Sequence, residues 1–579
     1  MEIESFSSIG LIESITRKGI TMKEMGISRR GFLGMGAASL AAAGMASLAG
    51  CAPQAKSADD SSKKGDASAE ASADWLGEAP EIAESDIKET IDTEVLCIGA
   101  GIAGLITAAQ VGEGGGKAIV VEKLGNPSTF RTDIGGIDTK IQLAQDVHVD
   151  KAGVINEIQR YCSGQANGRL LKIWADESGE AVDWVIDLLE EAGIEVYLET
   201  DPGASDMIYK EWTVTHGFND ASGAMDALVA RVEGTGGVIK YNCPMVKLER
   251  EEGGRVTGAI CQDGKEGYVR INASRGVVVA TGGFANNMDM LKALVPDMFE
   301  QCVMKEMTPS QDGDGIKASL WIGADMDPDG FAQAFERGCV PFEGEYEGPS
   351  EDGQIWWPGS QPFLRVTRRG ERFSNESTPY DFAMWAIREQ HDNTWVEIFD
   401  ANWQDQIAQF KTVGCSRIID PGTMPGWEPT MPMEAICGML EAYVEQGYIK
   451  KADTIEELAE AIGCDSKTLS ATIERYNELC DKGVDEDFYK ESSRMAALTT
   501  PPYYAARIGG MLLSSGSGLT VNTELQVLDK QGEAIEGLYA VGNDCGGTYA
   551  RTYPSRVAGL TMGRNVTFAR RIAKELTEK

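Results

Sequence analysis

Residues 91–123 read IDTEVLCIGAGIAGLITAAQVGEGGGKAIVVEK, and this stretch decides the fold. Val95 to Ile98 form a short apolar run of the kind that is buried on both faces of a sheet. Gly99, Gly101 and Gly104 follow it in the spacing G-x-G-x-x-G. The order of apolar run, glycines and apolar helical segment predicts a dinucleotide-binding βαβ unit.

Each part of this unit has a physical role. The three glycines permit a tight turn, the approach of backbone to a pyrophosphate, and close packing of helix on strand. A helix over residues 103–111 directs its N-terminal amides toward the phosphates. A second strand at 118–121 ends in Glu122, where a carboxylate can accept hydrogen bonds from a ribose. The motif alone leaves FAD and NAD both open.

Length and charge exclude some classes of function. A chain of 579 residues exceeds one hydrophobic core, so two or three domains are expected. The formal net charge of -37 gives no basic footprint for nucleic acid. The 12 cysteines form no C-x-x-C pair, and three histidines are too few for a haem or a metal site. We therefore expect neither nucleic acid nor metal as a partner.

The N-terminal region is typical of an export signal. Residues 28–33 read SRRGFL, a twin-arginine pattern, and an apolar, small-residue run follows to Ala49. Cys51 comes directly after LAG, as in a lipobox. We expect residues 1–50 to be a twin-arginine lipoprotein signal that leaves Cys51 lipid-anchored at the outer face of the cytoplasmic membrane. An ordinary alanine-rich helix is the alternative, and the polar residues 51–85 are expected to form a disordered tether.

Further motifs place this chain near a known family. The segments GAGIAG, VVEK, VVVATGGF, DGDGI, RRGERFSNE and IEGLYAVGND occur in this order between residues 99 and 544. They resemble the FAD-binding flavoprotein family of fumarate reductases, succinate dehydrogenases and 3-ketosteroid dehydrogenases, over residues from about 90 to 575. The resemblance implies FAD rather than NAD.

The same resemblance implies the fold. It is α/β, with a Rossmann-like FAD-binding domain and an inserted α+β capping domain that holds the substrate. The FAD-binding domain is expected over 86–325 and 503–579, and the capping domain over 326–502, where aromatic-rich loops and short helices change the pattern.

Family contacts with FAD carry over to specific positions. The resemblance places them at Gly99, Gly101, Ile102, Ala103, Gly104, Glu122, Lys123, Thr132, Gly135, Gly136, Val246, Ala280, Thr281, Gly282, Asp314, Gly542, Asp544 and Gly559. Succinate dehydrogenase-type members attach FAD to a histidine in the loop that here spans 128–137. This loop contains no histidine, so FAD is expected to be noncovalent.

The substrate anchors of fumarate reductases are absent. Gly359 stands at the position of their arginine proton donor, and their pocket histidines fall on Phe335 and roughly Ser514. Fumarate is therefore expected to be a poor substrate. Nearby aromatic residues would line an apolar pocket if they face the flavin, and ordinary packing is the alternative; they are Phe331, Phe335, Trp356, Trp357 and Phe363.

The segment RTYPSRVAG, residues 551–559, resembles the R-T-Y-P-G of 3-ketosteroid dehydrogenases. The resemblance implies that the Tyr553 hydroxyl polarises a substrate carbonyl and stabilises the enolate formed on reduction. Arg551 and Arg556 are alternative candidates, as binders of a substrate carboxylate. His216 is a further candidate beside the flavin, with a surface histidine as the alternative.

These observations predict an FAD-dependent ene-reductase. It would saturate a C=C bond conjugated to a carbonyl group, as in an enone or aryl-acrylate, with electrons from an external cytochrome or quinol-linked membrane protein. One alternative is a 3-ketosteroid-type dehydrogenase that works in the desaturating direction, and another is a fumarate- or urocanate-type reductase with altered anchors. A lipoprotein that binds a ligand for a transporter is the rival from another class.

Overall fold

The computed structural model describes residues 75–199, 209, 211–264, 267–305, 310–412, 416–418 and 431–578. The predicted export signal, and the predicted tether up to residue 74, lie outside the described residues. The indole N–H of Trp321 donates to the carbonyl oxygens of Leu76 and Gly77, both at 3.2 Å. The prediction of a disordered tether is therefore wrong for residues 75–85, because Trp75 and Leu76 supply apolar surface that the polar residues before them lack.

The first sheet has eight strands and follows the main order β17-β18-β9-β1-β2-β6, with the β7–β8 hairpin joined to β9. In the parallel pairing of β1 with β2 and β9, Ile98 lies beside both Val121 and Val279. Three strands therefore end at one edge of the sheet. The strands are β1 (Ile87–Ile98), β2 (Ala118–Val121), β6 (Val238–Lys240), β7 (Met245–Arg250), β8 (Val256–Gln262), β9 (Tyr268–Val279), β17 (Gln526–Leu528) and β18 (Ala534–Ala540).

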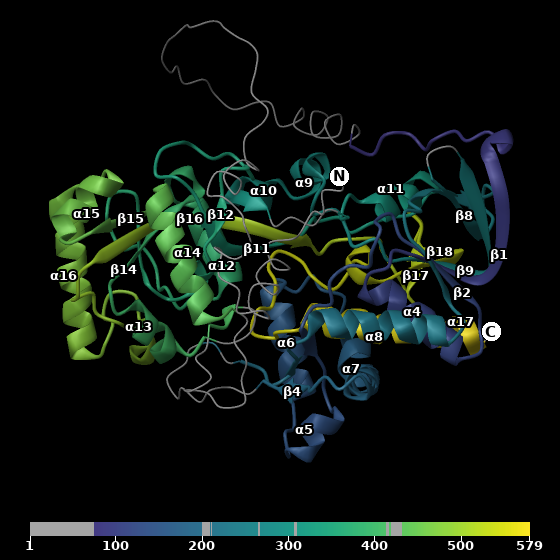
Figure 1. The fold of residues 1–579 in the computed structure, drawn as a ribbon, viewed down its shortest axis with the longest axis horizontal. Helices are drawn as coiled ribbons and strands as arrows, with labels where there is room; N and C mark the ends of the chain where they lie inside the picture. The colour runs from purple at the N-terminus through teal and green to yellow at the C-terminus, as the bar shows by residue number, and fades with distance from the viewer. Residues whose placement is uncertain are drawn as a thin grey trace, which may run out of the picture. The chain divides into compact units, whose positions relative to one another are not determined.

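Helices cover this sheet, and α17 packs against both α4 and α7 (Figure 1). Helix α4 is almost entirely buried because small and aliphatic residues occupy all its faces. The helices that precede the capping domain in the chain, together with the C-terminal helix, are α4 (Ile102–Glu113), α5 (Lys140–Ala144), α6 (Lys151–Tyr161), α7 (Gly168–Glu191), α8 (Ala221–Gly234), α9 (Met288–Leu294), α10 (Pro296–Gln301), α11 (Asp314–Trp321) and α17 (Leu560–Glu578), and α10 contacts strands of the second sheet.

A second sheet of seven strands forms the capping domain, in the order β12-β11-β16-β14-β13 with β10 and β15 also paired to β16. Its strands are β10 (Cys302–Lys305), β11 (Ala332–Cys339), β12 (Gln354–Ile355), β13 (Leu364–Val366), β14 (Trp395–Phe399), β15 (Ile449–Ala452) and β16 (Tyr503–Ser515). Its helices are α12 (Tyr380–Arg388), α13 (Trp403–Phe410), α14 (Met433–Gln446), α15 (Ile455–Ile462) and α16 (Ser466–Lys482). Strands β10 and β16 lie outside the predicted range 326–502, so this sheet draws on both flanking segments.

A third, three-stranded sheet has the order β3-β5-β4, with β3 (Asp133–Gly135), β4 (Tyr197–Leu198) and β5 (Thr215–Gly217). Helix α17 meets β3 backbone to backbone, because a Cβ added at Gly563 would lie 1.6 Å from the Gly135 carbonyl oxygen. Only a glycine fits at that helical position.

Within the described ranges, no helix combines enough length and enough apolar character to cross a bilayer.

The α17 contact predicts a contrast between two helical glycines. Gly563→Ala should destabilise the protein by about 1–3 kcal/mol or more, because the new methyl group must displace the β3 backbone. Gly438→Ala, in exposed α14 with nothing within 4 Å of the added Cβ, should stabilise by up to about 1 kcal/mol. Urea unfolding of both variants measures the difference, and equal effects would contradict the close contact.

Candidate active site

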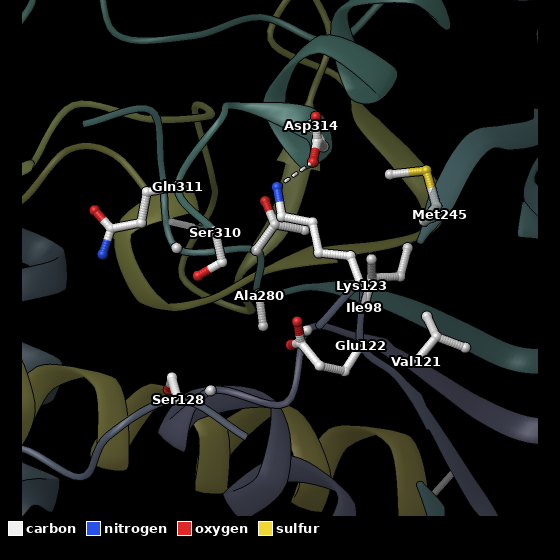
Figure 2. A pocket seen from close by; sticks show the side chains of 14 residues that line it. Ile98, Val121, Glu122, Lys123, Ser128, Met245, Ala280, Ser310, Gln311 and Asp314 are labelled. Carbon is white, nitrogen blue, oxygen red and sulfur yellow. Dashed lines mark hydrogen bonds and ion pairs between the residues drawn. The ribbon is translucent and has the colours of Figure 1, made fainter. Parts of the chain in front are cut away.

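A cavity lies at the edge of the first sheet where β1, β2 and β9 end (Figure 2). In parallel sheets ligands bind outside the carboxyl ends of the strands, so this is the expected place for a nucleotide. The cavity is lined by Ile98, Gly99, Gly101, Val121, Glu122, Lys123, Ser128, Met245, Ala280, Thr281, Gly282, Ser310, Gln311 and Asp314.

The three motif glycines differ in their surroundings. A Cβ added at Gly99, which has φ +111°, would lie 2.3 Å from the Ala280 carbonyl oxygen. At Gly104 the added Cβ would lie 2.1 Å from the Gly99 carbonyl oxygen, so both residues are held by close backbone packing. Gly101 has open space, with Ser128 Oγ nearest at 3.5 Å. Gly101 therefore leaves the room that a pyrophosphate needs at the start of α4.

The carboxylate of Glu122 is held in place by backbone. Its Oε2 accepts from the Ala100 N–H and its Oε1 from the Leu124 N–H, both at 2.8 Å. Each oxygen keeps a second acceptor site, and Glu122 lines the cavity. The side chain is thus fixed in an orientation that can accept from a ribose diol.

Lys123 and Asp314 line the same cavity and are paired with each other (Figure 2). The Lys123 ammonium lies 2.8 Å from Asp314 Oδ2 and 2.6 Å from Asp312 Oδ2. The pair joins the end of β2 to the start of α11 and so forms one wall of the cavity.

Asp544 anchors the turn after β9. Its buried carboxylate accepts from the Gly282 N–H at 3.2 Å, the Gly283 N–H at 3.1 Å and the Thr281 hydroxyl at 2.9 Å. Burial raises the pKa of Asp544 to about 6, and these donors oppose the shift. The contact joins the end of β18 to the turn that lines the cavity.

The remaining predicted cofactor residues lie around these elements. Ile102 and Ala103 begin α4, and Gly542 approaches Ala103, with an added Cβ 3.5 Å from the Ala103 Cβ. Val246 follows Met245, which lines the cavity, and Thr132 precedes β3.

The loop around β3 contacts the C-terminal segment. The Gly135 N–H donates to the Gly559 carbonyl at 2.8 Å, and the Gly136 N–H donates to Val214 at the same distance. The Thr215 hydroxyl also donates to the Ala558 carbonyl at 2.8 Å. The loop at 128–137, in which succinate dehydrogenase-type members attach FAD, is called the cofactor loop below. It is therefore bonded through Gly135 and Gly136 to the end of RTYPSRVAG and to Val214.

A second pocket lies between that segment and the capping domain, and its lining is mainly polar. The residues are Glu211, Glu336, Ser360, Glu376, Ser377, Thr378, Pro379, Tyr380, Thr412, Ser416, Arg494, Ser555 and Arg556. Only Arg556 among them was a candidate from the sequence. No motif marks the others, which come from many separate loops and strands.

Glu336 belongs to a buried group of charges beside Gly359. Its Oε1 accepts from Arg365 Nη2 at 2.9 Å, and its Oε2 is buried with no hydrogen-bond partner among the described residues. Arg365 lies directly opposite Glu397 in the β13–β14 ladder. Burial raises the pKa of Glu336, and it raises the pKa of Glu397 to about 8, with Arg365 opposing both shifts. Arg365 thus acts electrostatically on both carboxyl groups.

Gly359 has no room for a side chain, because an added Cβ would lie 2.3 Å from the Glu336 carbonyl oxygen. Its own carbonyl lies 3.3 Å from Arg365 Nη2. The guanidinium nearest this position therefore comes from β13 rather than from residue 359.

The five aromatic side chains that were predicted to line an apolar pocket line neither of these two pockets, and their contacts favour the packing alternative. Trp356 and Phe363 pack on Phe399 with ring centroids 5.8 and 5.3 Å apart. Phe331 packs on Tyr549, and Arg337 lies over the rings of both Phe335 and Trp357. Their apolar surface stabilises the interior of the protein, which was the packing alternative.

The three catalytic candidates from RTYPSRVAG lie in different surroundings. The Tyr553 hydroxyl lies 3.3 Å from Thr561 Oγ1, and the Tyr553 N–H donates to Asp381 at 3.2 Å. Arg551 is half-exposed and pairs with Asp329 at 3.4 Å. Of the three candidates from RTYPSRVAG, only Arg556 lines the polar pocket.

His216 is fully buried in β5, so the surface alternative is wrong. Its Nδ1 lies 3.2 and 3.1 Å from the carbonyl oxygens of Ile134 and Val214, and its Nε2 lies 2.7 Å from Thr139 Oγ1. Two carbonyl acceptors require a proton on Nδ1, so the neutral ring accepts from the threonine through Nε2. Burial lowers the pKa of His216 to about 4.

Comparisons with known proteins agree with this geometry. The family model described as an FAD binding domain matches residues 94–560. The vinyl phenol reductase of Lactiplantibacillus plantarum is 26% identical over 483 residues, 81% of this chain and 93% of its own length. The digoxin reductase of Eggerthella lenta is 25% identical and covers 94% of this chain and 97% of itself.

A solved structure of similar fold is a fumarate reductase. The open conformation of a flavocytochrome c3 fumarate reductase superposes with a TM-score of 0.63 at 25% identity, over 85% of this chain and 79% of that one.

His216 predicts a pH dependence of stability. Because the folded-state pKa of His216 is lowered from 6.5 to about 4, its stabilising contribution is present above pH 6.5 and is lost as pH falls toward 4. The full loss is about 3 kcal/mol. His216→Asn, which keeps a donor for the carbonyls, should reduce the fall in urea stability between pH 7 and 4.5. The exposed His148→Asn is the control, and equal slopes in both variants would refute the burial argument.

Proposed function

The chain belongs to the FAD-binding domain family, and from this premise we propose that it reduces a C=C bond conjugated to a carbonyl group. It is an FAD-dependent oxidoreductase. Gly101, Glu122 and the amides at the start of α4 fit the pyrophosphate and ribose of FAD, because space and fixed acceptors are both present. Bound FAD supplies the two-electron chemistry that no amino-acid side chain provides.

The observation that carries the proposal is the polar pocket beside the cofactor loop. Ser555 and Arg556 line it, and three residues further on Ala558 and Gly559 are bonded to Thr215 and Gly135. A substrate in this pocket lies between the capping domain and the segment that contacts the cofactor loop. Relatives named as reductases of a vinyl phenol and of urocanate support reduction as the direction.

Saturation of a C=C bond also requires a proton. We assign its delivery to Glu336, because it lines the pocket, carries an unpartnered Oε2, and shares Arg365 with Glu397. Burial favours the protonated form of both carboxyl groups and raises the pKa of Glu397 to about 8, while Arg365 and, at Glu336, also Arg337 oppose the shift. Glu336 then takes the role that an arginine has at the position of Gly359 in fumarate reductases.

Electrons reach the cofactor from outside the chain in this proposal. The donor is a cytochrome or a quinol-linked membrane protein, and two relatives that carry the name fumarate reductase (cytochrome) support such a partner. We also propose export by the twin-arginine route and anchoring through lipid on Cys51. Folded export fits a protein that must bind its cofactor before it crosses the membrane.

Glu336 gives the sharpest test of the reaction. With a chemically reduced dye as donor and an aryl-acrylate or enone as substrate, Glu336→Gln should lower kcat by about 10²-fold or more, because a positioned acid contributes on that order. Reduction of the flavin by the dye should be unchanged. The parent rate should fall at alkaline pH as the carboxyl pair loses its proton.

Controls for this test separate the candidates. Glu343→Gln, an exposed residue of the same domain, should act like the parent. If Tyr553→Phe lowers kcat and Glu336→Gln does not, the proton assignment is wrong and the tyrosine takes the main role. If no conjugated alkene is turned over, the proposed reaction itself is wrong.

The cofactor should be noncovalent. The purified protein is expected to be yellow and to release FAD into the supernatant on acid precipitation, because the loop at 128–137 offers no histidine for attachment. Flavin that stays in the precipitate would contradict this.

The export proposal has its own test. Changing Arg29 and Arg30 together to lysine should keep the protein in the cytoplasm, and Cys51→Ala should release the exported form from the membrane. Cell fractionation measures both, and a membrane-bound, exported protein in both variants would refute the signal assignment.

A further inference from the structure

We propose that Arg417 of the capping domain raises the reduction potential of the bound flavin, by compensating two buried acids beside the cofactor loop. The acids are Asp133, the first residue of β3, and Glu199, which directly follows β4. This inference rests on the proposed function and deepens it, because the potential of the flavin governs electron transfer from the donor to the alkene.

Arg417 lies within reach of both acids. Its Nη1 is 2.6 Å from Glu199 Oε1, and its Nη2 is 3.7 Å from Asp133 Oδ1. The same Nη2 donates to the hydroxyl of Tyr197 in β4 at 3.3 Å. Burial opposes the positive charge, but Glu199 and Asp133 outweigh it and raise the pKa of Arg417. The guanidinium therefore stays charged at neutral pH.

All three charged side chains are shielded from water. The exposed fraction is 3% for Arg417, 4% for Glu199 and 11% for Asp133. Charges in such surroundings are screened less by water and salt than surface charges, so each acts over a longer distance. Loss of the one cation would leave two acids without it in this place.

The capping domain holds Arg417 in position through the preceding residue. The Ser416 carbonyl accepts from Gln361 Nε2 at 2.8 Å, and the Ser416 hydroxyl accepts from Arg337 Nη2 at 3.0 Å. Ser416 itself lines the polar pocket. The charge that compensates the acids of the FAD-binding domain is thus supplied by the capping domain.

The cofactor loop runs past Asp133 between the two pockets. Ser128, at its start, lines the cavity that fits the pyrophosphate and ribose. Near its end Gly135 is bonded to Gly559, and Arg556 of the same C-terminal segment lines the polar pocket. A cofactor that extends from the cavity toward the polar pocket follows the residues between these points. Asp133 is one of them, so its charge lies beside the course of the cofactor.

The sign of the effect follows from electrostatics. Reduction adds electrons to the flavin, and a nearby negative charge opposes the negative charge that then builds up. A cation that compensates the acids therefore favours the reduced form. Arg417 exerts this effect through its charge, without contact to the substrate.

The reduction potential of the holoenzyme tests the assignment directly. Spectroelectrochemical titration at pH 8, which keeps the acids ionised, compares Arg417→Gln with the parent. The ratio of reduced to oxidised flavin at a fixed potential should fall on the order of 10-fold, a shift of about 30 mV for a two-electron couple. Arg417→Lys keeps the charge and should stay close to the parent. Arg369→Gln, an exposed arginine of the same domain, should match the parent.

Variants of the acid keep the test decisive if Arg417→Gln does not fold. Asp133→Asn alone removes a negative charge and should raise the potential. Combined with Arg417→Gln, it should restore most of the loss. A lower Tm in Arg417→Gln at an unchanged potential would mean that Arg417 only holds the fold, and would overturn the assignment. An equal fall in Arg417→Lys and Arg417→Gln would also overturn it, because contact geometry rather than charge would then be responsible.

No substrate enters these measurements, so they separate this inference from the proposed reaction. If no conjugated alkene is reduced but the Arg417→Gln and Asp133→Asn variants shift the potential in opposite directions, the charge assignment stands and the reaction falls. If alkenes are reduced and every variant has the potential of the parent, the reaction stands and the charge assignment falls.

Discussion

The approach of two backbones holds the proposed site together. The Gly135 N–H donates to the Gly559 carbonyl, and Gly563 of α17 lies against the Gly135 carbonyl with no room for a methyl group. These contacts join the loop at 128–137, in the first part of the FAD-binding domain, to residues 559–563 in its second part. Because Arg556 precedes Gly559 by three residues, the same contacts bring the polar pocket beside the cofactor loop. Any change that separates the two backbones should affect cofactor binding and substrate binding together.

Buried charge is the second constraint on the molecule. The capping sheet places Glu336, Arg365 and Glu397 in its interior, where burial would be costly without mutual pairing. Burial raises the pKa of both carboxyl groups, and Arg365 opposes the shift. This arrangement suits a proton donor. A buried group of charges is expensive for stability, which is characteristic of functional sites rather than of packing.

The cofactor cradle could be predicted because its determinants are local. Gly99, Gly101, Gly104 and Glu122 lie within one βαβ unit, where spacing along the chain fixes position in space. The polar pocket could not be predicted in this way, because its residues come from loops and strands far apart in the sequence. Arg494 lies in a segment that matches no motif. The aromatic residues of the capping domain could not be assigned from the sequence, since a large apolar side chain is as useful to a core as to a ligand. A charged residue inside an apolar strand, such as Glu397 in WVEIF, was the signal that could have revealed the buried charges.

The central claim is that an alkene in the polar pocket accepts electrons from the cofactor beside it. The most direct measurement reduces the purified holoenzyme with one equivalent of dithionite under anaerobic conditions and then adds an aryl-acrylate. The account predicts that the absorbance of oxidised flavin returns in a single turnover, with one equivalent of the saturated acid as product. A flavin that stays reduced with every conjugated alkene, yet is reoxidised promptly by an artificial acceptor, would contradict it.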